Sequence, residues 1–123
     1  MTAEERKSIV RRYFAEAFSR GNLAVIDEVA DTKVAAEMKR GILGLRTVFA
    51  DVVDNVEDQL AEGERVATRF SGGGIHHGAF HGIAPTGKAV AWTGIAIDRF
   101  ADGKIVERWA IVDVAGVLQQ LGK

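Results

Sequence analysis

Two oppositely charged residues on the last predicted hairpin, Asp98 and Arg108, are the best polar pair for chemistry in this sequence. Side chains alternate along strands, so both residues fall on the face that carries several small residues, and their strands are neighbours. A carboxylate there could act as an acid or base while the guanidinium orients an anionic group. The alternative is a structural ion pair near a pocket rim. Both interpretations stay open on the sequence alone.

Three histidines occur in one short stretch, at His76, His77 and His81. His76 and His77 are adjacent, so in a strand they point to opposite faces, and no carboxylate lies nearby in sequence to complete a metal site. We therefore expect neither a metal ion nor an organic cofactor. His76 alone is a candidate for a hydrogen bond at a pocket edge or for a structural role, and it joins Asp98 and Arg108 as a candidate catalytic residue.

Five other residues are candidates for lining a ligand pocket: Tyr13, Trp92, Gly94, Ala96 and Ala110. A three-residue connection at 101–103 would set Gly94 opposite Ala110, and Ala96 opposite Arg108, on one face. The small residues leave volume for a bulky apolar ligand, and the ring of Trp92 could stack on a planar one. For Tyr13 and Trp92 the alternative is packing in the core.

Two other polar or glycine-rich features have structural interpretations. Asp113 directly precedes the last predicted helix, so we expect it to cap that helix and not to act as a base. Three consecutive glycines, residues 72–74, interrupt a predicted strand and indicate a bend, a bulge or a close approach by another group. No lysine follows them, as a phosphate-binding loop would require.

The helices expected to position these residues come first in the chain. Thr2 and Glu5 have the form of a capping box, and the helix they begin ends at Gly21. A short helix capped by Asn22 follows. We then expect a short strand over residues 34–38 and a third helix whose apolar positions lie within 42–52.

Strands dominate from about residue 55 onward. We expect them over residues 56–61, 65–71, 89–100 and 104–112, followed by a helix over 114–121. Helices first and strands afterwards favour an α+β fold, with helices on one side of a curved antiparallel sheet, in a single domain spanning residues 1–123. The last hairpin is apolar on both faces, so we expect a homodimer to cover the face that the helices leave open.

The composition excludes several classes of partner. Sixteen Lys and Arg residues balance seventeen Asp and Glu residues for a net charge of -1, without the basic footprint of a nucleic-acid-binding protein. No cysteine is present, which excludes disulfides and thiolate chemistry. No apolar run is long enough for a signal peptide or a membrane span, so we expect a cytoplasmic protein without membrane contact.

Short segments along most of the chain match one known family in order and spacing. They are residues 9–12 with Phe14, 21–23, 61–66, His76, 82–87, 102–107 and 116–122. On these segments the sequence resembles the SnoaL-like family, the polyketide and ester cyclases of the nuclear-transport-factor-2-like fold. Residues 31–41 depart from the pattern, because this stretch is shorter and lacks the polar first-strand residues that often reach the pocket.

The resemblance implies a conical α+β barrel, dimerisation through the sheet, and a pocket between sheet and helices. It also implies an aldol condensation that uses an aspartate of the last strand as base and a histidine of the strand before, at positions held here by Ala110 and Ala96. The chain could therefore be a cyclase, isomerase or hydrolase for an apolar carbonyl or polycyclic compound without that dyad, with Glu37 as a candidate substitute base. Alternatively, it is a non-catalytic dimeric binding or carrier domain for an apolar ligand.

Overall fold

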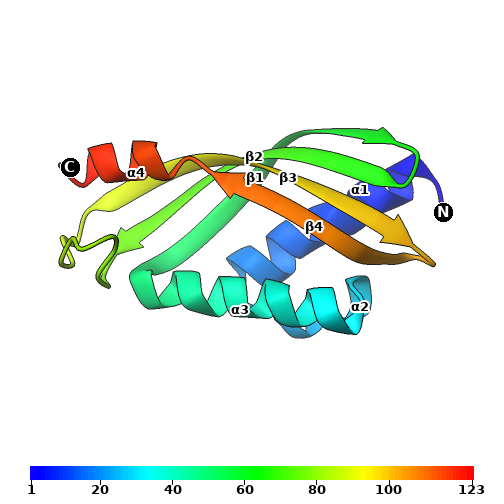
Figure 1. Cartoon of the computed structure of the whole chain (residues 1–123), viewed down its shortest axis with the longest axis horizontal. Coiled ribbons are helices and arrows are strands. Elements are labelled where there is room, and N and C mark those ends of the chain that lie inside the picture. Colours follow the sequence, from blue (N-terminus) through cyan, green and yellow to red (C-terminus); the bar gives the residue numbers. More distant parts are fainter.

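Four antiparallel strands form one sheet in chain order, and the helices precede and follow it (Figure 1). The computed structural model describes residues 1–123. Its elements are α1 (Ala3–Arg12), the π-helical segment η1 (Tyr13–Ser19), α2 (Ala24–Val29), α3 (Thr32–Val48), β1 (Phe49–Glu62), β2 (Arg65–His76), β3 (Ala89–Ala101), β4 (Lys104–Val112) and α4 (Val114–Gln120). The predicted α+β fold is confirmed. None of the helices is long and apolar enough to cross a membrane.

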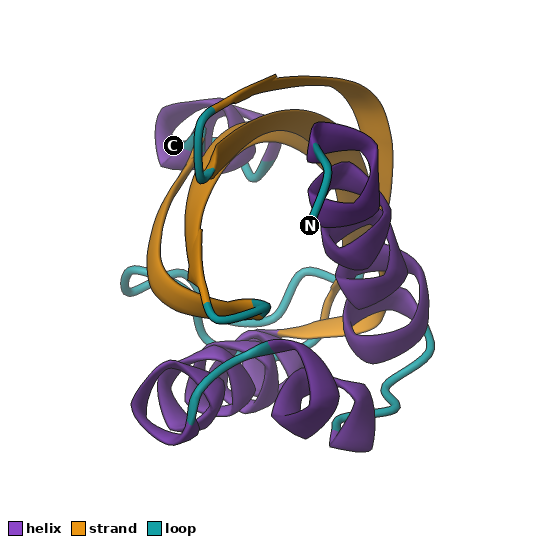
Figure 2. Cartoon of the chain, turned by 90° about the vertical axis from the view of Figure 1, so that its right-hand side faces the viewer, coloured by secondary structure: helices purple, strands orange, loops and turns teal.

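The sheet curves strongly, and helices close the open side of the curve (Figure 2). Apolar side chains fill the space between the layers; for example, the ring of Phe14 in η1 lies 5.0 Å from that of Phe70 in β2. The other face of the sheet carries exposed apolar side chains, among them Ile95, Trp109 and Ile111. The curvature therefore creates one enclosed interior and leaves the outer face open.

The first helix begins where the sequence predicts. The side chain of Thr2 accepts a hydrogen bond from the backbone N–H of Glu5 at 3.0 Å, which caps α1. The helix continues without a break into η1, and the chain turns at Gly21, whose φ is 78°. Such π-helical turns occur often at functional sites. This one places Tyr13 and Phe14 toward the interior, where both are buried.

The expected strand over residues 34–38 is wrong, because these residues belong to α3. The carboxylate of Asp31 caps this helix by accepting from the N–H of Val34 at 2.9 Å. Val34, Met38 and Ile42 recur at helical spacing and are all buried. Burial of this face outweighs the cost of two glycines in the helix. The predicted cap at Asn22 is also wrong, since α2 has Leu23 at its N-cap position and no side-chain cap.

The first strand begins at Phe49, several residues before the predicted change from helix to strand. It pairs with Gly72 and Gly73 of β2, and β2 continues through residues 72–74 as far as His76. The irregularity lies opposite, in β1 between Ala50 and Val53, where Asp51 has a φ of 51°. A Cβ at Gly73 would lie 2.2 Å from the carbonyl oxygen of Val90. The β1–β2 pair therefore contains a bulge at the glycines, and close approach by the neighbouring strand explains Gly73.

The last hairpin has a different register from the one we expected. Its connection has two residues, Asp102 and Gly103, both with positive φ, and β4 contains a bulge near the turn. Ala96 therefore pairs with Ala110, and Asp98 with Arg108. The displacement by two residues keeps the side chains beyond the bulge, from Glu107 to Val112, on their predicted faces. The bulge also turns Ile105 inward, where it is fully buried, instead of outward with Trp109.

Candidate active site

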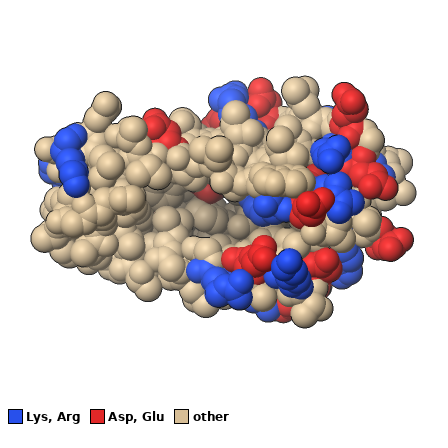
Figure 3. All heavy atoms as spheres, in the orientation of Figure 1, with Lys and Arg blue, Asp and Glu red and all other residues tan.

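A cavity of about 390 Å³ lies between the sheet and the helices η1, α3 and α4. Most of its lining is apolar, and its charged side chains are Glu37, Asp54 and Arg108. Figure 3 shows the molecule hollowed between its upper and lower layers, with charged side chains gathered mainly toward one end. The size and lining are typical of a small-molecule site with a few placed polar groups.

Asp54 is the buried carboxylate of this cavity. It lies on β1 with only 6% of its surface exposed, and its Oδ1 accepts a hydrogen bond from Nε1 of Trp92 at 2.7 Å. Its backbone N–H donates to the hydroxyl of Ser19 in η1 at 3.1 Å, which fixes the strand against the helix. The second oxygen, Oδ2, makes no hydrogen bond and is accessible to solvent. One face of the carboxylate is therefore available to a ligand.

Burial raises the pKa of Asp54 to about 6. The hydrogen bond from Trp92 and the positive charge of Arg108 both oppose that rise. The surrounding apolar side chains disfavour the charged form, because they cannot solvate it. A carboxylate with a pKa near 6 is mostly ionised at neutral pH, and it is a stronger base than an exposed one.

Gly72 makes the position of Asp54 possible. It pairs with Asp54 on one side and with Trp92 on the other. A Cβ at Gly72 would lie 2.0 Å from Oδ1 of Asp54. Because that side chain is missing, the carboxylate and the indole can meet across the intervening strand.

Arg108 brings a positive charge to the same cavity from β4. Its Nη1 donates to both oxygens of Asp98, at 2.7 and 2.8 Å, and its guanidinium carbon lies 4.6 Å from the centre of the Tyr13 ring. Asp98 is fully buried and does not line the cavity. Burial raises the pKa of Asp98, and the adjacent Arg108 charge opposes that rise. Arg108 has two further donors, Nη2 and Nε, which make no hydrogen bond and are accessible to solvent. They can therefore donate to a ligand.

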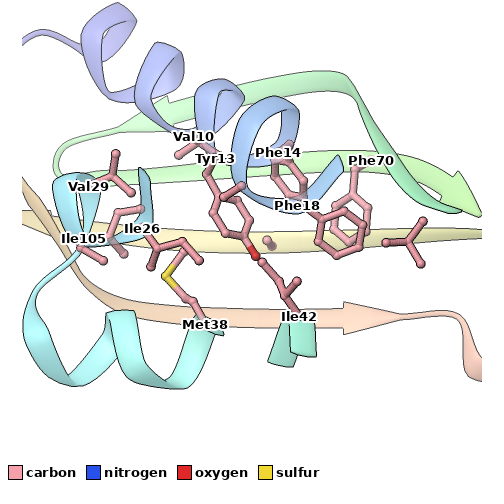
Figure 4. Packing of buried hydrophobic residues seen from close by; sticks show 14 of the residues in the cluster. Val10, Tyr13, Phe14, Phe18, Ile26, Val29, Met38, Ile42, Phe70 and Ile105 are labelled. Atoms are coloured by element: carbon pink, nitrogen blue, oxygen red, sulfur yellow. The ribbon is translucent and has the colours of Figure 1, made fainter. Parts of the chain in front are cut away.

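Tyr13 supplies a neutral donor. Burial raises the pKa of its hydroxyl, with a smaller opposing effect from Arg108, so the group stays protonated at neutral pH. The hydroxyl makes no hydrogen bond within the chain and is accessible to solvent. In Figure 4 its oxygen points from the helix toward Ile42 of α3. The cavity thus combines one available carboxylate oxygen with uncommitted donors from a phenol and a guanidinium.

The family model of the SnoaL-like polyketide cyclases matches residues 8–121 of the sequence. The chain belongs to this family. The match spans nearly the whole chain, from the first helix to the last, and so includes every strand of the sheet. No curated protein matches the sequence of this SnoaL-like protein.

Solved structures share the fold closely. AclR from Streptomyces galilaeus, provisionally described as a hydroxylase, is 30% identical and superposes with a TM-score of 0.86 over 98% of this chain and 83% of its own. IdmH from Streptomyces antibioticus, provisionally described as a polyketide cyclase, is 26% identical, with a TM-score of 0.79 over 96% and 99% of the two chains. TsrD from Streptomyces laurentii is 20% identical, with a TM-score of 0.89 over 99% and 98%, and shows the fold alone.

Of the residues that the sequence suggested for this SnoaL-like site, those in the cavity lining are Tyr13, Trp92, Arg108 and Ala110, and Glu37 lies at its exposed edge. Ala96 is fully buried outside the lining, and the ring of Phe70 covers Gly94. His76 is also fully buried; its Nδ1 lies 2.9 Å from the Thr86 hydroxyl. Asp98 does not line the cavity, but it accepts hydrogen bonds from Arg108, which does. Asp113 caps α4 as expected, since its Oδ1 accepts from the N–H of Gly116 at 2.9 Å.

Asp54, the most buried acid of the cavity, is not among the residues predicted from the sequence. The reason is that we expected a helix over 42–52 and strands only from about residue 55, so Asp54 falls outside the predicted strands. In the structure it lies within β1, which begins at Phe49. Val52, Asp54 and Val56 share one parity, and the two valines are the apolar positions of an inward face. An acid between them on the same face is a sign of a functional group, but only if the segment is first recognised as a strand.

Proposed function

We propose that this SnoaL-like protein catalyses proton transfer at a carbon next to the carbonyl group of an apolar or polycyclic substrate, with ring closure by intramolecular aldol addition as the overall reaction. The observation that carries the proposal is Asp54, a buried carboxylate with a pKa of about 6 and one available oxygen. Perturbed carboxylates in clefts are candidates for general bases. Membership of the polyketide cyclase family supports the same reaction class.

The groups of the cavity suffice for a balanced reaction without a cofactor. Asp54 takes a proton from the carbon next to the carbonyl, and the resulting enolate oxygen accepts hydrogen bonds from Tyr13 and Arg108. The enolate carbon then bonds to a second carbonyl carbon of the same molecule. The new alkoxide takes the proton back from Asp54, which restores the carboxylate. Donors aimed at the developing negative charge in a dry site stabilise it strongly.

Asp54 would replace the base that the family resemblance puts at the position of Ala110. Ala110 and Ala96 pair with each other on neighbouring strands, and neither can transfer a proton. Asp54 reaches the cavity from β1, three strands away from β4 in the sheet. Ala110 then provides space for the substrate, and neither alanine takes part in the chemistry.

The test is deuterium incorporation into 2-tetralone, a bicyclic apolar ketone with acidic protons beside its carbonyl, followed by NMR in D₂O. We expect Asp54→Asn to lower the protein-catalysed exchange by about 10²–10⁴-fold, the usual contribution of a general base. Asp51→Asn changes an exposed carboxylate of the same strand and should have no effect. Binding of 2-tetralone by the native protein without exchange would favour the alternative, a non-catalytic binding domain.

We also propose that a second copy of the chain covers the outer face of the sheet. Ile95, Trp109 and Ile111 are 55%, 49% and 78% exposed on neighbouring strands there. A twofold axis over this patch would bring it against itself, and closed twofold dimers are the commonest oligomers. Dimerisation through the sheet is also what the family resemblance implies.

A further inference from the structure

The exposed part of the cavity lining lies on α3 and at the end of the sheet. It consists of Glu37 and Gly41 on α3 and Ala110, Val112 and Val114 at the end of the sheet. The rest of the lining is buried or half-buried. A ligand too large for the interior must therefore leave it between α3 and β4.

Gly41 lies on the helical side of this mouth. Glu37 and Leu45, one turn before and one turn after it, also line the cavity, so Gly41 forms a gap between two longer side chains. A glycine inside a helix costs about 1 kcal/mol relative to alanine. A Cβ at this position would meet no atom within 4 Å, so packing within the chain gives no reason for a glycine.

Gly44 provides a contrast on the same helix. It is also exposed, and a Cβ there would likewise meet nothing within 4 Å. Unlike Gly41, it does not line the cavity. The two glycines therefore have the same cost to the helix and differ in whether a ligand can reach them.

We propose that Gly41 determines specificity for elongated substrates. The carbonyl end lies inside with Tyr13 and Arg108, and the apolar body leaves the cavity across the bare backbone of α3 at Gly41. Glycine permits such close approach of a ligand to the backbone. Across the mouth, the small side chain of Ala110 leaves room for the same body. The orientation of the substrate rests on the proposed function, whereas the selection by length is a separate property.

The test compares two ketones that share one head, 2-acetylnaphthalene and 2-acetyl-6-(4-hydroxyphenyl)naphthalene, by isothermal titration calorimetry. We expect Gly41→Leu to weaken binding of the longer ketone by about tenfold or more, equivalent to about 1.4 kcal/mol, and to leave the shorter one unchanged. Gly44→Leu should change neither. Gly41→Ala should raise the melting temperature as Gly44→Ala does, and should weaken only the longer ketone, by a smaller factor.

Equal losses for both ketones in Gly41→Leu, no loss for the longer one, or the same selective loss in Gly44→Leu would each overturn the inference. The readout is binding and does not require turnover. Failure of the Asp54→Asn exchange experiment would therefore leave this result intact, and the two proposals can fail separately.

Discussion

Asp54 and Trp92 lie on strands that are not neighbours, yet their side chains share a hydrogen bond of 2.7 Å. Between them stands Gly72, which pairs with both residues. The missing side chain lets the carboxylate and the indole meet on the inner face of the sheet. The pair joins β1 to β3 and sets the position of the acid that we propose as the base.

Trp92→Phe removes the hydrogen bond and keeps an aromatic ring. Since that bond lowers the pKa of Asp54, we expect the pKa to rise above its value of about 6. The base must be ionised, so the midpoint of the pH profile of 2-tetralone exchange should move upward. Trp109→Phe changes a half-exposed tryptophan of the outer face and should leave the midpoint in place. An unchanged midpoint in Trp92→Phe would contradict the role of the bond.

The stability of the protein should depend on pH through Asp54. The pKa of this group is about 6 in the folded chain, above its value of about 3.9 in an unfolded one. The folded state therefore binds the proton more tightly, and stability falls as pH rises through the interval between the two values. The penalty is absent below pH ~4 and complete above pH ~6, where it reaches about 3 kcal/mol.

The measurement for this effect is denaturant unfolding of the native protein and Asp54→Asn at pH 4 and pH 7.5. The variant should gain stability relative to the native protein by about 2–3 kcal/mol between the two pH values. Asp51→Asn, at an exposed site on the same strand, is the control and should show no such gain. A constant difference across pH would mean that the Asp54 pKa is not raised.

Asp98→Asn should destabilise the fold, because it leaves the mostly buried Arg108 without a counter-charge. Removing one partner of a buried pair costs about 3–5 kcal/mol. Asp58→Asn breaks the exposed pair between Asp58 and Arg69 and should cost less than about 1 kcal/mol. Urea unfolding gives both values. Similar small losses in the two variants would show that Arg108 does not depend on Asp98.

Ile111→Glu should dissociate the proposed dimer. Ile111 is 78% exposed on the outer face, so the substitution should leave the fold of a single chain intact. In the dimer, however, it would bury a charge in an apolar contact. Light scattering after size exclusion should report a dimer for the native protein and a monomer for the variant. Leu60→Glu, at an exposed position on β1, tests whether any apolar-to-charged change has this effect.

Local patterns predicted most of the elements. The capping residues Thr2 and Asp113 begin helices as expected, and the last two strands have nearly the predicted bounds. The errors lie where a short apolar run is compatible with either structure. Residues 34–38 form a helix and Phe49 begins a strand, because in each case long-range packing decides between two local preferences of similar strength.

By itself the sequence determined the α+β class, the family, and the face that most side chains of the last hairpin take, because strand alternation and capping depend on near neighbours. Only the tertiary structure decided the site. The bulge and two-residue turn set Asp98 opposite Arg108, and the curvature of the sheet buried Asp54 beside Trp92 across Gly72. Residues far apart in the chain create that apolar surrounding, and the raised pKa of Asp54 exists only once they are packed together.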